Sequence, residues 1–252
     1  MPLLSVKQLK IDFPETSFTA VNEISFDINE GEILALVGES GSGKSLTALS
    51  ILGLQPVNAI ISGAIYFKEM DLVKKPYPPA VRACKIALIA QDPLSALNPM
   101  YSIKDQLFEA VQVYQKKLKN EEIYQLCFDY LEKVGIPDPD RTLDAYPHEI
   151  SGGMRQRVMI AMAIINEPDL LIADEPTTAL DVTVQAVILE LLKSLKKTIL
   201  FITHDLGVVA EIADRVLVMK DGLIVESGTV FELFDKPQED YTKQLLAAVP
   251  SL

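Results

Sequence analysis

The sequence feature that most constrains the fold is the octapeptide at residues 38–45, Gly-Glu-Ser-Gly-Ser-Gly-Lys-Ser. It matches a pattern in which two glycines flank four residues and are followed by lysine and then serine or threonine. An apolar run, Ile33–Val37, precedes the octapeptide, and a helix-compatible segment, Leu46–Leu54, follows it. This order of strand, loop and helix is the setting in which such a loop binds a phosphate chain.

The residue types of this loop suit a triphosphate. Glycines let backbone amides curl around the phosphates, and the start of the helix adds a partial positive charge. Lys44 is able to reach the β- and γ-phosphates, and the Ser45 hydroxyl is able to bind Mg²⁺. A flexible glycine turn is a poor alternative, because the pattern arises by chance in roughly one chain in a hundred of this length. We therefore expect nucleotide contacts from Gly38, Glu39, Ser40, Gly41, Ser42, Gly43, Lys44, Ser45 and Leu46.

Composition narrows the class of protein. The chain has 252 residues, 49% of them hydrophobic, which suffices for one sizeable core with a smaller subdomain attached. Its net charge of −12 argues against a broad nucleic-acid-binding face, which needs clustered lysine and arginine. We see neither a signal peptide nor an apolar stretch near the ~18 residues that span a bilayer. We expect a soluble cytosolic chain that is able to sit against a membrane protein, with Cys84 and Cys127 as reduced thiols.

The N-terminal part alternates apolar and polar residues, as the strands of a half-buried sheet do. The strand candidates are Leu3–Phe13, Ile24–Ile28 and Ile61–Phe67, with a turn at Pro14–Ser17. Together they predict an antiparallel layer. A buried strand, Lys85–Ala90, follows and ends at Gln91-Asp92-Pro93.

The sequence pattern becomes helical over residues 93–148, which predicts that they form the bulk of a helical subdomain. Two helical patterns, Ile103–Lys117 and Glu121–Val134, lie here, and Gly135 and Pro137 close the second. The next segment, Ser151–Asn166, is strongly helical with Ser151 at its cap.

The remaining segments alternate strands with helices. Asp169–Ala173 and Thr198–Thr203 are apolar strands of the kind that is buried in a parallel sheet. Arg215–Lys220 and Leu223–Glu226 flank Asp221-Gly222, a hairpin turn signal. This alternation predicts an α/β core with right-handed crossovers. We expect Asp181 to cap the helix that lies between the two apolar strands. The apolar face of this helix consists of Val184, Val187, Ile188, Leu191, Leu192 and Leu195.

Polar side chains follow three of the predicted core strands, where an α/β sheet binds its ligands. Asp174 is placed to hold Mg²⁺, and Glu175 could act as the general base that polarises the attacking water. Gln91 could bind Mg²⁺ and orient water, and His204 could contact the γ-phosphate. Alone, each has an ordinary alternative: an acidic cap, a surface glutamine, or a histidine that makes a structural hydrogen bond.

Ser151-Gly152-Gly153 opens a helix and exposes several backbone amides, which makes a second anion site. One phosphate loop and one separate anion site favour a dimer. Each nucleotide would lie between the loop of one subunit and residues 151–153 of the other. The alternative is a capped helix after a glycine turn, which is frequent.

The order of these motifs resembles the ATP-binding cassette ATPases over nearly the whole chain. Residues 38–45 resemble the Walker A loop, Gln91 the Q-loop, residues 151–153 the signature motif, and Leu170–Glu175 the Walker B strand with its catalytic carboxylate. Asp181 resembles the D-loop aspartate and His204 the switch histidine. Phe13 falls where the family places an aromatic residue that stacks on adenine, with Phe18 as the second choice. The signature departs from the family at Met154, where glutamine is usual, and Thr178 stands where serine is common in the D-loop.

The resemblance implies an α/β fold, with a P-loop NTPase (RecA-like) core, an N-terminal antiparallel β-subdomain and an inserted α-helical subdomain. One nucleotide-binding domain would fill residues 1–252. Residues 1–92 and 164–252 would form the core with the β-subdomain, and about 93–163 the helical subdomain with the signature motif.

A finer resemblance points to importers of oligopeptides, dipeptides and nickel. It rests on three stretches, residues 91–99, 146–157 and 173–185, and on the tail Tyr241-Thr242-Lys243-Gln244-Leu245-Leu246. The chain stops at Leu252 without the extension common in peptide-importer ATPases, which favours a short nickel-type ATPase or a shortened chain. The cargo therefore stays open between peptide and nickel.

The implied activity is transport-coupled ATP hydrolysis on the cytoplasmic side of the inner membrane. The implied catalytic residues are Glu175, His204, Gln91 and Lys44, with Mg²⁺ on Ser45, Gln91 and Asp174. The implied partners are a second ATPase subunit, identical or not, the transmembrane permease and, indirectly, an external solute-binding protein, with no nucleic acid. Two alternatives remain: a soluble cassette ATPase of DNA repair or translation, and an ATP sensor without turnover.

Overall fold

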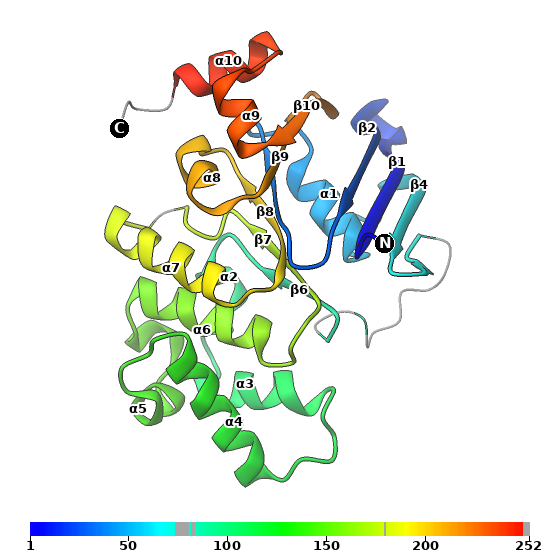
Figure 1. The fold of residues 1–252 in the computed structure, drawn as a ribbon. Helices are drawn as coiled ribbons and strands as arrows, with labels where there is room; N and C mark the ends of the chain where they lie inside the picture. The colour runs from blue at the N-terminus through cyan, green and yellow to red at the C-terminus, as the bar shows by residue number, and fades with distance from the viewer. Residues whose placement is uncertain (74–80, 82–83, 179, 249–252) are drawn as a thin grey trace. The chain divides into compact units, whose positions relative to one another are not determined.

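The computed structural model describes residues 1–73, 81, 84–178 and 180–248. Ala179, in the predicted D-loop, lies outside the described residues. By its internal contacts the chain divides into two units, one formed by Met1–Pro79 with Lys196–Leu252 and the other by Ala80–Leu195 (Figure 1). The boundaries of the helical subdomain stay a prediction.

The first unit contains the antiparallel layer that the N-terminal pattern predicts. Its strands lie in the order β2-β1-β4-β5, and β1 pairs antiparallel with both β2 and β4. The predicted strand at 24–28 begins earlier, at Phe18, because a 3-10 turn at Pro14–Thr16 and a left-handed Ser17 return the chain at once to pair Phe18 with Phe13. The elements are β1 (Leu4–Phe13), β2 (Phe18–Ile28), β4 (Ile60–Phe67) and β5 (Met70–Asp71).

The first unit also contains buried parallel strands. β3 (Ile33–Val37) pairs parallel with β8 (Thr198–Thr203) and β9 (Arg215–Lys220), and β9 pairs antiparallel with β10 (Leu223–Thr229). Asp221 and Gly222 both have positive φ, 48° and 79°, which confirms the predicted hairpin turn. The Gly222 N–H donates to the Ser42 carbonyl at 3.1 Å, so this turn touches the phosphate loop.

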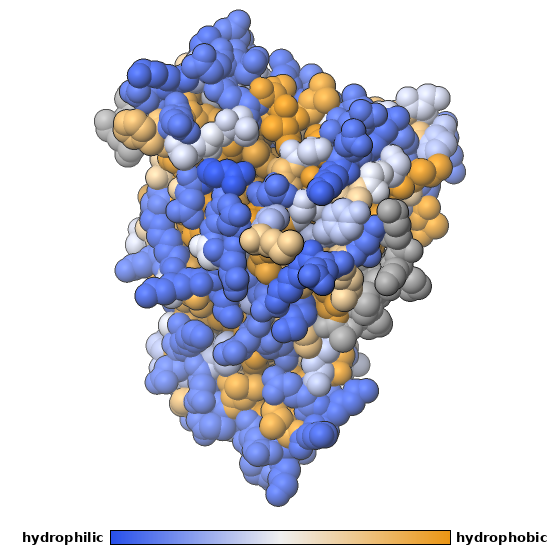
Figure 2. All heavy atoms as spheres, turned by 45° about the vertical axis from the view of Figure 1, so that its right-hand side comes forward, coloured by the Kyte–Doolittle hydropathy of each residue, from blue (hydrophilic) through white to orange (hydrophobic). Residues whose placement is uncertain are grey.

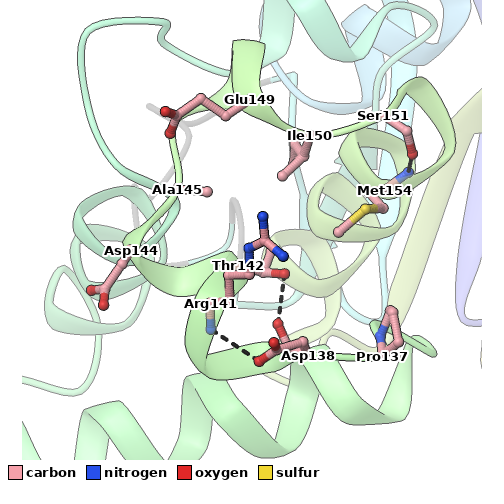
Figure 3. Close-up of a pocket in the computed structure, with 10 residues that line it drawn as sticks. All are labelled: Pro137, Asp138, Arg141, Thr142, Asp144, Ala145, Glu149, Ile150, Ser151 and Met154. Carbon is pink, nitrogen blue, oxygen red and sulfur yellow. Dashed lines mark hydrogen bonds between the residues drawn. The ribbon is translucent and has the colours of Figure 1, made fainter.

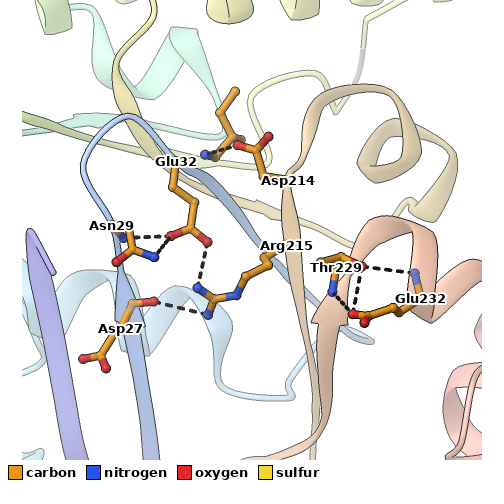
Figure 4. Close-up of polar contacts among 8 residues, drawn as sticks. Asp27, Asn29, Glu32, Asp214, Arg215, Thr229 and Glu232 are labelled. Carbon is orange, nitrogen blue, oxygen red and sulfur yellow. Dashed lines mark hydrogen bonds and ion pairs between the residues drawn. The ribbon is translucent and has the colours of Figure 1, made fainter.

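A cluster of polar contacts fixes the amino end of β3 (Figure 4). Arg215 Nη1 lies 2.8 Å from Glu32 Oε1, and Asn29 donates its backbone and side-chain N–H groups to Glu32 Oε2 at 2.7 and 2.9 Å. Asp214 Oδ2 accepts from the Ile33 N–H at 2.8 Å. Since β3 carries the loop at its carboxyl end, these contacts help to hold the strand from which the loop leaves.

Among its described residues the first unit also contains the α-helices α1 (Lys44–Ile51), α8 (Leu206–Ile212), α9 (Val230–Asp235) and α10 (Asp240–Ala247). The predicted helix at 46–54 is displaced toward the loop, since α1 already begins inside the motif at Lys44. Thr229 and Glu232 form a capping box that opens α9 (Figure 4). The sequence pattern predicted no helix at α8, α9 or α10, because each is short.

The second unit consists mainly of helices beside two parallel strands. β6 (Ile86–Ile89) pairs with β7 (Leu170–Asp174), with Ile89 opposite Ala173. Alongside a short 3-10 turn at Pro147–Glu149, the helices are α2 (Pro93–Ala96), α3 (Ile103–Gln112), α4 (Asn120–Lys133), α5 (Pro139–Asp144), α6 (Gly152–Ile164) and α7 (Val182–Ser194). Together with the antiparallel layer and the parallel strands of the first unit, these elements confirm the predicted α/β class.

Two helix predictions in this unit need correction. The helix predicted over 103–117 ends at Gln112, and Asn166 Nδ2 donates to the Ala110 carbonyl in its last turn at 2.9 Å. The apolar face of α7 is also rotated: Leu189 is fully buried, whereas Val187 is 37% exposed. Tertiary packing selects which part of a broad apolar stripe is covered.

Most of the hydrophobic side chains are buried in the interiors of the two units. In the described part of the chain, no helix has both the length and the apolar composition to cross a membrane. The face drawn in Figure 2 is mostly hydrophilic, and its hydrophobic residues are divided into separate groups.

Candidate functional site

The phosphate loop leaves β3 and runs directly into α1. Lys44 at its end is 5% exposed, and its Nζ donates to the carbonyls of Gly38 and Glu39 at 2.8 Å each and to Ser42 Oγ at 3.3 Å. The ammonium group is therefore held against the loop by the loop's own oxygens. A lysine ammonium group held among the backbone groups of a loop suits the binding of a phosphate chain, because positive charge and backbone amides bind phosphates together.

Two loop glycines are required by close backbone approach. A Cβ on Gly38 would lie 2.1 Å from the Met219 carbonyl oxygen of β9. Gly43 has a φ of 106°, and a Cβ there would lie 2.6 Å from the Ala20 carbonyl oxygen of β2. β9 and β2 thus support the loop from outside, and side chains at these positions would push it out of shape.

His204 stands at the same strand edge as the loop. It follows β8, whose last residue Thr203 is the register partner of Val37, the residue before the loop. Parallel strands deliver their carboxyl ends to one edge. The structure therefore brings His204 and the start of the loop to neighbouring strand ends, as the sequence predicts.

Phe13 lies at the end of β1, half-buried, and stacks on Phe18 with 6.5 Å between ring centroids and 26° between ring planes. The two aromatic candidates therefore form one stacked pair at a turn. Phe13 is the more buried of the two rings, and Phe18 is 55% exposed.

The acidic candidates belong to the second unit, where Gln91 and Glu175 meet. Asp174 is the last residue of β7, and Glu175 follows it with a positive φ of 47°. Gln91 Nε2 and Thr178 Oγ1 each donate to Glu175 Oε2 at 3.0 Å. An uncommon backbone conformation and two donors on one oxygen indicate a carboxylate held in a defined orientation.

Ser151 and Asp181 begin two helices of the second unit. Ser151 Oγ accepts from the Met154 N–H at 3.3 Å at the start of α6, beside a surface pocket into which Arg141 points (Figure 3). Asp181 Oδ1 accepts from the Val184 N–H at 3.0 Å at the start of α7. Both caps are confirmed as predicted.

The glycines after Ser151 make the close helix packing possible. A Cβ on Gly153 would lie 3.2 Å from Val184 Cγ1, whereas Gly152 has room, with the nearest atom at 3.9 Å. Gly153 thus lets α6 approach α7 closely. The first N–H groups of a helix have no partner inside the helix, so the start of α6 keeps the features on which the predicted anion site depends.

Gln156 is a site residue that the sequence pattern did not single out. It is 1% exposed on α6, and its Nε2 donates to the Pro176 carbonyl at 2.6 Å, in the segment that follows Glu175. The only signal in the sequence is a polar residue on a face that is otherwise buried and apolar. Because its partner lies 20 residues away, the contact depends on the tertiary structure.

The residues present fit a bound Mg²⁺. Among the described residues, no group of three or more His, Cys, Asp or Glu could hold a metal by itself. Magnesium bound with a nucleotide takes most of its oxygens from phosphates and water and needs only one or two protein ligands. The hydroxyl of Ser45, the amide of Gln91 and the carboxylate of Asp174 are oxygen donors of that kind.

Comparison with known proteins identifies the architecture. Residues 21–178 match the sequence profile of the ABC transporter family. The chain is 30% identical to cbiO1 of Clostridium perfringens, part of the ABC transporter complex cbiONQ, with a TM-score of 0.79 over 93% of this chain and 91% of that one. It is 28% identical to the ATP-binding cassette MJ0796 in a dimeric, post-hydrolysis structure with ADP and Pi, with a TM-score of 0.77 over 90% and 98%.

Curated relatives match almost the whole chain. The peptidoglycan transport ATP-binding protein YejF of Agrobacterium fabrum is 53% identical over 99% of this chain, but the chain spans only 47% of that protein. The dipeptide transport ATP-binding protein DppD of Bacillus subtilis is 49% identical over 99% of this chain and 77% of its own length. The oligopeptide transport ATP-binding protein OppD of the same organism is 48% identical over 99% and 72%.

Proposed function

Because the chain belongs to the ABC transporter family, we propose that it is the ATP-hydrolysing subunit of an importer that brings peptides across the cytoplasmic membrane. The observation that carries the proposal is the phosphate loop with Lys44 held inside it by three loop oxygens. A loop of this form, with its lysine and its backbone amides at the start of a helix, binds the phosphates of a nucleotide.

We assign the steps of hydrolysis to individual side chains. The loop amides of residues 38–46 and Lys44 bind the phosphates, and His204 contacts the γ-phosphate. Glu175 accepts a proton from the attacking water, while Gln91 and Thr178 orient its carboxylate through their hydrogen bonds. Phosphoryl transfer mainly needs positioning and charge neutralisation, which these side chains supply.

Ser45, Gln91 and Asp174 would hold Mg²⁺, which neutralises phosphate charge when it is bound. Phe13 would stack on adenine. Its place in a stacked pair with Phe18 supports an aromatic platform.

The second anion site supports a dimer of cassettes. In the proposed dimer, Ser151, Gly152 and Gly153 of one subunit face the nucleotide on the loop of the other, with Asp181 at the same interface. The structural neighbour MJ0796 is itself described as a dimer. The partner is a second ATPase subunit, identical or different, and the pair sits on the cytoplasmic face of the membrane against permease subunits, served by an external solute-binding protein.

We propose peptides as the cargo and set nickel aside. Two of the relatives are dipeptide and oligopeptide transport ATP-binding proteins by name, and neither name refers to nickel. Reconstitution of the chain with its permease and binding protein in vesicles decides the cargo. ATP-dependent uptake of a labelled oligopeptide is expected, whereas uptake of Ni²⁺ in its place would overturn the assignment.

The activity is tested on the purified chain. We expect ATP binding and slow ATP hydrolysis, and Lys44→Met should weaken ATP binding by about ten- to hundredfold, since it removes a charged donor. Lys236→Met is the matched control, because the Lys236 side chain is 82% exposed. A wild-type chain that binds no ATP, or a Lys44→Met variant that binds it as tightly as wild type, contradicts the proposal.

A further inference from the structure

The C-terminal helix α10 touches the phosphate loop through one hydrogen bond. The Glu39 N–H donates to the Tyr241 hydroxyl oxygen at 3.0 Å, although the two residues are 202 positions apart in the chain. We propose that Tyr241 is a positioning residue for the phosphate loop. It holds the peptide unit between Gly38 and Glu39 in the orientation that nucleotide binding requires. This inference rests on the proposed function, since it concerns the same loop.

The Tyr241 ring packs in a buried cluster and against a lysine, so its hydroxyl group has a defined position. Tyr241 is 8% exposed, and Lys220 Nζ lies 4.7 Å from the ring centroid. Burial raises the pKa of its phenol, so the hydroxyl stays protonated at neutral pH. The ring belongs to a buried cluster with Ala35, Val37, Leu206, Val209, Val216, Val218 and Leu233.

The helix that carries Tyr241 is itself anchored at its start. Glu226 of β10 accepts from the backbone N–H of Gln238 at 2.8 Å through Oε1 and from that of Glu239 at 3.1 Å through Oε2. Glu239 is the N-cap of α10, red in Figure 1. Tyr241 therefore stands two residues beyond a point that is tied to the sheet.

The peptide unit between Gly38 and Glu39 is held at both of its polar groups. Its N–H group, on Glu39, donates to the Tyr241 hydroxyl, and its carbonyl, on Gly38, accepts from Lys44 Nζ at 2.8 Å. Without the tyrosine hydroxyl, this peptide unit loses one of its two hydrogen bonds and is free to rotate. The carbonyl that holds Lys44 rotates with it, so the loop must be ordered again when nucleotide binds, and affinity falls.

Tyr130 offers a matched control. Like Tyr241 it is 8% exposed, carries a lysine over its ring (Lys133 Nζ at 4.9 Å from the centroid), and forms a hydroxyl hydrogen bond, here to Glu167 Oε1 at 3.1 Å. Tyr130 belongs to the other unit and contacts no loop residue in the hydrogen bonds described. Tyr130→Phe therefore reports the general effect of losing a buried hydroxyl.

The experiment compares Tyr241→Phe, Tyr130→Phe and wild type by three measurements: hydrogen exchange of the Glu39 amide without nucleotide, the dependence of ATP hydrolysis on ATP concentration, and thermal unfolding. For Tyr241→Phe we expect faster exchange at Glu39 and an increase of about three- to tenfold in the KM for ATP, with kcat within about twofold. For Tyr130→Phe we expect wild-type exchange at Glu39 and a wild-type KM, at a similar loss of thermal stability.

Wild-type protection of the Glu39 amide in Tyr241→Phe overturns the inference, and so does a fall in kcat at unchanged KM. An equal rise of KM in both variants shows a general loss of stability and also overturns it. If wild type fails to bind ATP, the proposed function fails by itself, and the exchange of Glu39 still decides whether Tyr241 positions the loop.

Discussion

Gln91 Nε2 lies 3.0 Å from Glu175 Oε2, and this hydrogen bond joins the segment after β6 to the residue after β7. The same oxygen accepts from Thr178 Oγ1, also at 3.0 Å. Two donors on one carboxylate oxygen fix its direction. The orientation of the proposed base therefore depends on side chains on both sides of it.

The first prediction concerns Thr178. Thr178→Val keeps the shape of the side chain and removes one of the two donors to Glu175. We expect kcat to fall by about three- to thirtyfold with little change in ATP affinity, because one hydrogen bond to a charged group is lost. Steady-state ATPase kinetics measure it. Thr183→Val, at an exposed position of α7, is the control and should behave as wild type.

The second prediction concerns the base itself. Glu175→Gln keeps the size of the side chain but cannot accept the proton of the attacking water. We expect hydrolysis to fall by about 10²- to 10⁴-fold while ATP binding stays near the wild-type level. Single-turnover hydrolysis and equilibrium binding separate the two effects. Glu190→Gln, at an exposed position of α7, should hydrolyse ATP normally, and a wild-type rate in Glu175→Gln would show that another group is the base.

The third prediction compares two glycines of the loop. Gly38→Ala forces a Cβ to within 2.1 Å of the Met219 carbonyl, so backbone must move, whereas no atom lies within 4 Å of a Cβ on Gly41. We expect Gly38→Ala to lower the free energy of unfolding by about 3 kcal/mol. Gly41→Ala should lower the free energy of unfolding by only about 1–2 kcal/mol, because the alanine has room but must adopt a positive φ of 84°. Denaturant unfolding gives both values, and equal losses would contradict the close approach of β9.

The fourth prediction concerns pH and Glu226. Burial raises the pKa of Glu226, but hydrogen bonds from the Gln238 N–H, the Thr242 side chain and the Glu239 N–H, together with the charge of Lys243, outweigh it, so the pKa lies below its usual 4.5. The unfolded chain thus takes up this proton at higher pH than the folded protein does. The stabilisation is complete at neutral pH and is lost as the pH falls from about 4.5 through the lower folded-state pKa.

Glu226→Gln should remove the pH-dependent contribution of Glu226 to the stability of the fold. We expect its melting temperature to lie about 2–4 °C below wild type near neutral pH. The gap should narrow as the pH falls below about 4.5 and the wild-type carboxylate becomes protonated too. Thermal unfolding across that range measures it, with Glu190→Gln as the control. A gap that stays constant over the whole range would mean that the carboxylate charge is not what holds the start of α10.

The features that the sequence predicts well are local ones. The phosphate loop, the caps at Ser151 and Asp181 and the turn at Asp221-Gly222 each depend on a few adjacent residues, and the structure has them as predicted. Errors fall where distant residues intervene. The helix from Ile103 ends earlier than its pattern predicts, and its last turn binds Asn166, a side chain 56 positions away from the Ala110 carbonyl.

The amino-acid sequence by itself determined the family, the α/β class and the candidate side chains, because a loop, a cap or a strand end is specified by neighbours that the backbone already holds together. The tertiary structure alone decided which partners those side chains have. Gln91 with Glu175, Gln156 with Pro176 and Tyr241 with Glu39 are separated by 84, 20 and 202 positions. No periodicity or spacing encodes such pairs, since they depend on how packed strands and helices bring remote segments within hydrogen-bonding distance.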